Sequence, residues 1–460
     1  MSRTPGTWPL VVGLALSLAA ASPGCSETDD AAGSCAAESC RARCVSLGYP
    51  MGGHCEGSNC SCGSSGDAGD GTGDIPADIS GRTTRMTGKV WSPGGLVPIS
   101  GALVYFAMND PAPIPAGAYP EVCQDPPAFH AISAADGTFA VEVLPGTYRL
   151  VTQKGQFRRI RDITVPETGP AEIDEDHTTL PSRNAPDDTI PHIALVWALE
   201  GGDHIEDVLA KMQMGTVGSD DRLVRGSEQF DIYNITGYPP NTELLENLDR
   251  MLQYHILFFP CTIWGGGLDE QLNDPTGPLS DPAVLANLRA YANAGGKIYA
   301  TDMMYDIFEQ PMPDYLDMCG DDASLNDADQ TAWADMRTAS GWTSHGRSVD
   351  ADLSAWLDAN VADHSNIDFL ENFVWIEAWY DTPDPDPAGP VPPKIWVEGD
   401  LILEPSRTLP LTVTWPYGAG KVLFSTYHTV GEGGHAGIYP QEYVLIYLIM
   451  EIGVCQDPFF

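Results

Sequence analysis

Strand and helix patterns alternate between residues 188 and 455, and this alternation restricts the fold more than any other feature. Apolar runs typical of buried strands occur at Ile193–Trp197, Phe230–Tyr233, His255–Phe259, Lys297–Asp302 and Lys421–His428. Helical patterns separate them, over Asp203–Met212, from an Asn241 cap to Leu252, from Asp281 to Gly296, and over Gln441–Glu451. Since parallel strands need crossover helices, residues 188–455 are predicted to form an α/β, doubly wound parallel sheet of the flavodoxin-like kind.

Residues 84–166 have a different pattern, in which short runs of alternating apolar and polar residues are separated by turn signals. Phe139, Val141 and Val143 alternate between the turn signals Asp136-Gly137 and Pro145-Gly146. This spacing predicts a small antiparallel β-sandwich. The segment resembles the carboxypeptidase regulatory-like (transthyretin-like) fold through Gly88-Lys89-Val90, Pro98–Val104, Asp136–Phe139 and Leu144–Tyr148. The resemblance implies a stabilising or adhesive module, and related sandwiches include carbohydrate-binding members. Trp91 and Tyr148 are the aromatic residues that could form a binding platform, and we expect both in the core instead.

Three pieces of residues 188–455 resemble the class I glutamine amidotransferase-like fold, including its ThuA-like members. Phe259–Gly267 looks like the oxyanion loop, the segment up to Gly295-Gly296 like the helix before the nucleophile strand, and Lys421–His428 like the strand that delivers the catalytic His. Residues 311–395 are atypical. The nucleophile position holds Asp302 where the family has Cys, and Thr429-Val430 follow His428 where it has Pro and Glu. We therefore expect no glutamine hydrolysis through a thioester.

The candidate catalytic residues are Asp302, His428 and Cys261, and none is assigned with certainty by the sequence. Cys261 is either a substitute nucleophile or the disulfide partner of Cys319, and an oxidising compartment favours the disulfide. Asp302, His428, Glu432 and His435 form either an acid–base or metal cluster at the strand ends or a polar rim. We expect no metal and no cofactor.

The N-terminal sequence has the pattern of an export signal. Arg3 precedes the apolar run Trp8–Ala21, so residues 1–24 are predicted to be a signal peptide. Gly24-Cys25 resembles a bacterial lipobox, which implies that Cys25 is lipidated; the alternative is an ordinary secretory signal with a free Cys25. Ser26 favours the outer membrane over the inner one. The expected location is therefore the outer membrane, lipid-anchored on its periplasmic or cell-surface side.

Residues 34–63 hold six cysteines, at Cys35, Cys40, Cys44, Cys55, Cys60 and Cys62. Cys40 and Cys44 share a helix face and Cys60 and Cys62 a strand face, so two bridges can pin helix to strand. The module resembles the cysteine-stabilised αβ scaffold of defensins, which implies the pairs Cys35–Cys55, Cys40–Cys60 and Cys44–Cys62. A metal site is the weaker alternative, because C-x2-C pairs are absent. Cys123 and Cys455 are left as a further pair, and residues 64–80 are read as a flexible acidic linker rather than a calcium loop.

Charge excludes one class of partner. Lys and Arg number 23 against 64 Asp and Glu, a net charge of −41, which argues against nucleic acid. The leading hypothesis is a cell-surface lipoprotein, held to the membrane through its lipid, with a non-catalytic binding or adhesion role toward an envelope or extracellular ligand. The alternative is a hydrolase that uses the strand-end pocket of the last domain. Convergence of Asp302, His428 and a third polar group would favour the hydrolase.

Overall fold

The computed structural model describes residues 53–56, 59–62, 83–121, 126–196, 202–234, 237–261, 278–319, 324–325, 342–382, 389–401, 404–430 and 434–454. The chain divides into two compact units, Met1–Asp74 and Ile75–Phe460. In the first unit, the described residues form an antiparallel hairpin of β1 (Gly53–Glu56) and β2 (Asn59–Cys62), with Cys55 opposite Cys60. The strand expected around Cys60 and Cys62 is confirmed. Cys25, the expected Cys40–Cys44 helix and the linker lie outside the described residues, so the lipidation and disulfide pairings of this unit stay predictions.

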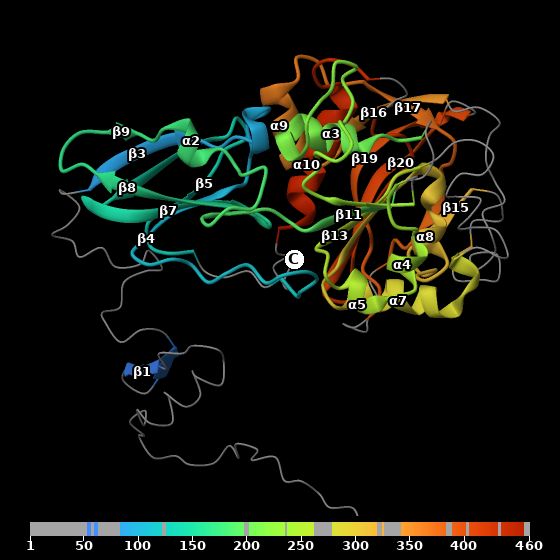
Figure 1. Cartoon of the computed structure of the whole chain (residues 1–460), viewed down its shortest axis with the longest axis horizontal. Coiled ribbons are helices and arrows are strands. Elements are labelled where there is room, and N and C mark those ends of the chain that lie inside the picture. Colours follow the sequence, from blue (N-terminus) through green and yellow to red (C-terminus); the bar gives the residue numbers. More distant parts are fainter. Residues whose placement is uncertain are drawn as a thin grey trace, which may run out of the picture. The chain divides into compact units, whose positions relative to one another are not determined.

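Two facing sheets make up the start of the second unit (Figure 1). The larger has the order β10-β8-β7-β4-β5 and the smaller β6-β3-β9. Their bounds are β3 Thr84–Lys89, β4 Leu103–Ala107, β5 His130–Ile132, β6 Thr138–Val143, β7 Gly146–Lys154, β8 Phe157–Val165, β9 Ala171–Glu172 and β10 Asp188–Thr189, with a short helix α2 at Glu175–Thr178. Side chains of β6 alternate between exposed and buried, as the sequence pattern predicts. Within these two sheets, the described strand pairs are antiparallel except β3 with β9.

A nine-stranded sheet forms the α/β part, in the order β12-β11-β13-β14-β21-β20-β19-β16-β17. The first five strands in this order, from β12 to β21, pair in parallel. The remaining four, β20, β19, β16 and β17, pair in antiparallel fashion, beginning with β20 against β21. Their bounds are β11 Ile193–Val196, β12 Asp231–Tyr233, β13 Ile256–Phe259, β14 Lys297–Thr301, β16 Trp342–Ser348, β17 Ile367–Asn372, β19 Lys394–Leu401, β20 Glu404–Tyr417 and β21 Gly420–Ser425. The prediction of an all-parallel sheet was therefore wrong for its second half, because three of the four antiparallel strands begin within residues 311–395, where no strand of the sheet was predicted. A separate pair joins β15 (Leu316–Met318) to β18 (Ile376–Trp379).

Helices cover both faces of this sheet, as a doubly wound arrangement requires. Along β11, Ile193 and Leu195 belong to one hydrophobic cluster and Ala194 and Val196 to another. The first cluster includes residues of α3 (Ile205–Leu209), α9 (Ala351–Asn360) and α10 (Pro440–Ile452); the second includes residues of α4 (Thr242–Leu245), α5 (Leu248–Met251), α7 (Pro282–Asn293) and α8 (Asp306–Glu309). A π-helical turn, Ala210–Met214, extends α3.

Two helix predictions have different outcomes. The helix α7 begins as expected, since Asp281 accepts a hydrogen bond from the backbone N–H of Ala283 and Pro282 occupies the first turn. It ends at Asn293, and Gly295 follows with a φ of +104° and a contact with the Tyr119 carbonyl that leave no room for a Cβ. The single helix expected from Asn241 to Leu252 is instead two short ones, and the side chain that caps is Asn247, which accepts from the N–H of Arg250.

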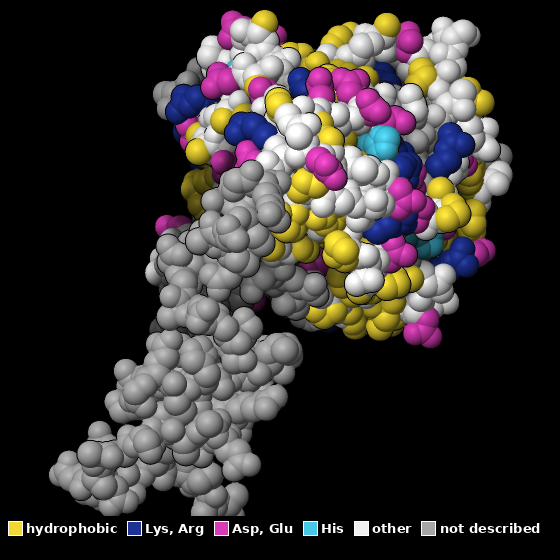
Figure 2. Space-filling model, turned by 90° about the vertical axis from the view of Figure 1, so that its left-hand side faces the viewer, with side chains coloured by type: hydrophobic (Ala, Val, Ile, Leu, Met, Phe, Trp, Pro, Cys, Tyr) yellow, Lys and Arg dark blue, Asp and Glu magenta, His cyan; other side chains and the backbone are white. Residues whose placement is uncertain are grey.

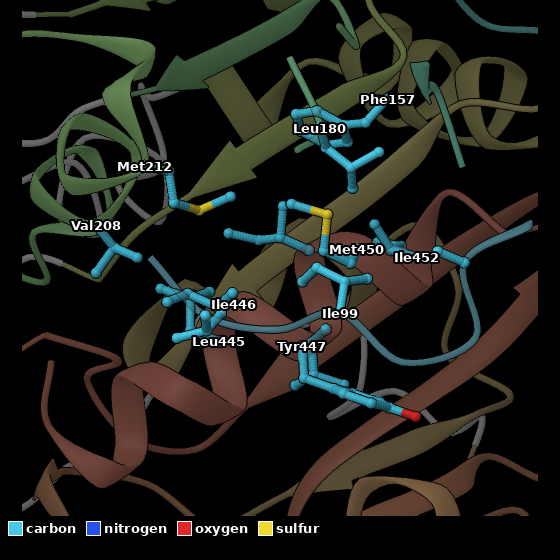
Figure 3. Close-up of a cluster of buried hydrophobic side chains, with 14 of the residues drawn as sticks. Ile99, Phe157, Leu180, Val208, Met212, Leu445, Ile446, Tyr447, Met450 and Ile452 are labelled. Carbon is cyan, nitrogen blue, oxygen red and sulfur yellow. The ribbon is translucent and has the colours of Figure 1, made fainter. Parts of the chain in front are cut away.

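The sandwich and the α/β part share one core. Helix α10 is buried on nearly all sides, and its apolar residues meet side chains from the sandwich and from α3 (Figure 3). The labelled members of this cluster are Ile99, Phe157, Leu180, Val208, Met212, Leu445, Ile446, Tyr447, Met450 and Ile452. Two polar contacts reinforce the junction, Lys154 Nζ with Glu451 Oε2 at 2.6 Å and Trp356 Nε1 with the Pro98 carbonyl at 2.7 Å.

Acidic and basic side chains are interspersed on the face of the molecule in Figure 2. One basic residue shows the local pattern: Arg149 donates to Asp110, Asp162 and Asp187, each at 2.7–2.8 Å. Three carboxylates thus surround this single guanidinium. Among the helices that the structure describes, none has the length and apolar composition needed to cross a membrane.

Candidate active site

Four ionisable side chains gather where the parallel strands end at their carboxyl edge. Asp302 follows β14 directly, Cys261 lies two residues after β13, His428 lies three residues after β21, and Asp203 lies on the segment after β11. All four have side chains with 0% exposure. The carboxyl edge of a parallel sheet is where open α/β proteins bind ligands, so the fold delivers these groups to the expected place.

Asp302 stands on a strained turn. Its φ is +48°, in the left-handed region that residues other than Gly rarely adopt. Strain of this kind persists where the surrounding structure enforces it, and it concentrates at functional sites. The Oδ1 atom accepts a hydrogen bond from the N–H of Phe373 at 3.1 Å. Burial raises the pKa of Asp302 to about 6, against the lowering effect of His428 and of that N–H.

His428 lies between two carboxylates. Its Nδ1 is 2.7 Å from Oε2 of Glu371, and its Nε2 is 3.4 Å from Oδ2 of Asp302. At 3.4 Å the second contact is an ion-pair distance rather than a hydrogen bond, and Nε2 has no hydrogen-bond partner. Burial by itself lowers the pKa of His428, but Cys261, Asp302 and Glu371 outweigh it, so the pKa is raised well above its ordinary value.

Glu371 comes from the far edge of the sheet. It lies in β17 with a φ of +57°, so its backbone is also in the left-handed region. Its side chain is 30% exposed, whereas those of Asp302 and His428 are fully buried. Solvent therefore reaches the group at Glu371, and this carboxylate orients the imidazole from outside.

Cys261 is held close to Asp302 as a thiol. Its Sγ is 3.7 Å from Asp302 Oδ2, and its N–H donates to Oγ1 of Thr301 at 2.9 Å. Burial, with a contribution from Asp302, raises the pKa of the thiol to about 12. At neutral pH the sulfur thus stays protonated, which makes it a poor nucleophile.

The disulfide predicted between Cys261 and Cys319 is not formed, because the structure holds both residues as free, buried thiols. The two sulfurs have different surroundings. Cys319 exchanges contacts with Trp375, accepting from its backbone N–H at 3.5 Å, while Cys261 faces Asp302. Proximity to the strand ends was thus a poor guide to which thiols meet.

Asp203 holds two chain segments of the site in place through hydrogen bonds. Its carboxylate accepts hydrogen bonds from the N–H and hydroxyl of Thr429 and from the N–H of Val430, at 2.9–3.0 Å. Its own N–H donates to the Cys261 carbonyl at 2.8 Å. These bonds fix the segment after β21 that carries His428. Burial nevertheless raises the pKa of Asp203.

The proposed four-residue cluster is only partly assembled. The structure brings Asp302 and His428 together, but His435 stands elsewhere, 2.9 Å from Glu442 and stacked on Tyr439. Glu432 lies outside the described residues. Sequence reasoning missed Glu371 and Asp203. The one signal for Asp203 was its position at the start of the helical pattern that follows the first predicted strand, and nothing local marks Glu371.

Among the residues that the structure describes, two buried groups could hold a metal ion, each with ligand atoms within 4.8 Å of one another: Cys261, Asp302 and His428, and His204, Glu206 and Asp207. The first is part of the site above. In the second, Arg222 Nη1 lies 3.4 Å from Asp207 Oδ2, so a cation already occupies its neighbourhood.

Comparison with known proteins leaves the family undefined. No family model and no curated protein matches the sequence. Similar solved structures include a cytoplasmic protein from Salmonella typhimurium (12% identity, TM-score 0.32, covering 57% of this chain and 98% of that one) and a ThuA-like protein from Bacteroides uniformis (10%, 0.32, 58% and 95%). A β-galactosidase from Bacillus circulans is also similar (9%, 0.30, 57% and 30%). Similarity at this level defines neither a family nor an activity for this chain.

Proposed function

We propose that the α/β part is a hydrolase whose reactive centre is the Asp302–His428 pair, oriented by Glu371. The observation that carries the proposal is the continuous contact from Asp302 through His428 to Glu371, with the first two fully buried beside a strained turn. An orienting carboxylate on the distal nitrogen of a histidine is the arrangement that acid–base catalysis requires.

Water is the attacking group in this proposal. Cys261 is a buried thiol with a pKa of about 12, so thioester chemistry has no thiolate to start from. A water molecule at the pair instead adds its hydroxyl to a carbonyl carbon, and its proton passes through the centre to the leaving group. One water is consumed and one acyl–oxygen or acyl–nitrogen bond is broken, with no change in oxidation state.

The negative charge of the site restricts the substrates that it can bind. The site assembles the carboxylates of Asp203, Asp302 and Glu371 around a single imidazole. An anionic substrate placed beside these carboxylates would meet electrostatic repulsion in a low dielectric. We therefore propose neutral or cationic acyl compounds, esters or amides, as substrates.

A panel of neutral esters and amides, with p-nitrophenyl acetate as the first probe, tests this function on the full chain. Asp302→Asn and His428→Ala should each lower kcat/KM by on the order of 100-fold or more. The matched controls are Asp207→Asn, another buried aspartate whose pKa is raised to about 6, and His435→Ala; both should retain activity. No turnover by the wild type, or equal turnover by Asp302→Asn, would refute the hydrolase and favour the non-catalytic binding role.

We propose that this hydrolase acts at the cell envelope, held by a lipid on Cys25. The support is the sequence alone, an apolar Trp8–Ala21 run followed by Gly24-Cys25. Cys25→Ser should move the protein from the membrane fraction to the soluble fraction of the producing bacterium, and a distribution that does not change would contradict the anchor.

A further inference from the structure

The reactive centre contains one atom whose environment the acid–base proposal does not explain. His428 Nε2 is fully buried and makes no hydrogen bond, although burying an unsatisfied nitrogen costs free energy. It points toward Asp302, and the thiol of Cys261 completes a group whose ligand atoms lie within 4.8 Å of one another. An imidazole, a carboxylate and a thiol facing one small volume form a mixed nitrogen, oxygen and sulfur donor set.

We propose that Cys261, Asp302 and His428 bind a divalent metal ion of the zinc class. The inference rests on the proposed function and makes it more specific, because the ion rather than the free carboxylate would polarise the attacking water. Three protein ligands leave a fourth tetrahedral position for that water, the pattern of catalytic zinc sites.

The spacing of the ligand atoms fits such an ion. Nε2 of His428 is 3.4 Å from Oδ2 of Asp302, which is 3.7 Å from Sγ of Cys261. Tetrahedral zinc with bonds of about 2.0 Å to nitrogen and oxygen and about 2.3 Å to sulfur separates its ligands by roughly 3.3–3.6 Å. The three side chains therefore need to shift by only a few tenths of an ångström, within the scatter of such sites.

The surroundings supply the supporting contacts that metal ligands require. Glu371 accepts from Nδ1 of His428 at 2.7 Å, which fixes the tautomer that leaves Nε2 for the ion. Asp302 is held by the Phe373 N–H through its other oxygen, and Cys261 by backbone bonds to Thr301 and Asp203. Each ligand thus comes from the end of a strand or the segment directly after it.

The three kinds of ligand atom at this site, nitrogen, oxygen and sulfur, favour zinc over magnesium and calcium. Magnesium and calcium prefer oxygen ligands alone, so a thiolate and an imidazole disfavour them. Zinc accepts all three donor types. Binding releases the thiol proton to solvent, and the divalent charge then faces the Cys261 thiolate and the Asp302 carboxylate, which neutralise it.

Metal analysis of the full chain, followed by titration with Zn²⁺ and Co²⁺ under reducing conditions, tests the inference. We expect a bound zinc ion and, with cobalt, a thiolate-to-metal charge-transfer band, both lost in Cys261→Ser and in His428→Ala. Cys319→Ser, which removes a second buried free thiol among the described residues, should keep both, as should Glu206→Gln in the second group. Glu371→Gln should weaken affinity by about 10- to 100-fold.

Thermal unfolding with and without zinc shows whether a variant that lost the metal still folds. A Cys261→Ser chain that melts cooperatively but gains no stability from zinc supports the site. Absence of zinc binding by the wild type, or retention of the cobalt band in Cys261→Ser, overturns the inference. Hydrolysis that survives chelation would support the proposed hydrolase and refute a catalytic metal. Bound zinc without turnover of any ester or amide would support the metal site and refute the hydrolase.

Discussion

The parallel strands carry buried ionisable side chains at both ends, and the two ends treat them differently. At the carboxyl end, Cys261, Asp302 and His428 converge on one another. At the amino end the side chains reach away from the sheet: Lys297, the first residue of β14, pairs with Glu121 at 3.2 Å, and Lys421 of β21 donates to the Val454 carbonyl at 2.5 Å. His255, just before β13, contacts the Pro115 carbonyl at 2.9 Å.

At the amino end, the contacts of Lys297, Lys421 and His255 join the sheet to the chain segments that pack against it, and we call this set of contacts the fastening. Glu121 and Pro115 belong to the insertion after β4, so each contact ties that insertion to a different strand. At the carboxyl end the groups instead share one small volume, the backbones of Asp302 and Glu371 are strained, and His428 Nε2 lacks a hydrogen bond. Neither burial nor an atom without a hydrogen bond marks a functional group by itself, since Lys297 Nζ at the amino end also lacks a hydrogen bond; convergence of several ionisable groups does.

Breaking the fastening should have the largest effect on stability. Lys297→Met leaves Glu121 buried without its ammonium partner, and the loss of one member of a buried pair costs about 3–5 kcal/mol. Urea unfolding at neutral pH measures this cost, and the double variant Lys297→Met/Glu121→Leu should recover part of it. A loss below about 1 kcal/mol would show that the pair is not a fastening.

The two ends should respond to pH with opposite signs, beginning with Lys421. Burial lowers its pKa from 10.5 to about 8. Between those values the unfolded chain binds more protons than the folded one, so stability rises with pH by about 3 kcal/mol from this group. Lys421→Met should remove that rise while leaving the curve below pH 8 parallel to that of the wild type. An unchanged slope between pH 8 and 10 would argue that Lys421 is solvated.

Asp302 should give the reverse dependence in the metal-free chain. Its pKa is raised from 3.8 to about 6, so between these values the folded state holds the extra proton and stability falls as pH rises, by about 3 kcal/mol. With a chelator present, Asp302→Asn should flatten this fall and match or exceed the wild type in stability at pH 7. A variant markedly less stable than the wild type would place Asp302 among the fastening residues instead.

Glu371→Gln should change stability least, by less than about 1 kcal/mol, because the side chain is 30% exposed. Its effect should appear in the imidazole: without the carboxylate, the pKa of His428 should fall. NMR titration of the histidine measures this directly, and Glu398→Gln, on the neighbouring antiparallel strands and paired with Arg347, is the control for a carboxylate outside the site.

The sequence by itself determined the strands that carry the site and the positions at which they end. Runs of apolar residues fixed β11, β13, β14 and β21, and their carboxyl ends placed Asp302 and His428 at one edge, since parallel strands end together. Tertiary structure alone decided the rest. Glu371 arrives from β17, the outermost of four antiparallel strands, so its contact depends on the packing order of the whole sheet. The pairing of Phe259 with Ala300 sets Cys261 beside Asp302, because residues equally far beyond a paired position lie side by side; no spacing along the chain records which strands are neighbours.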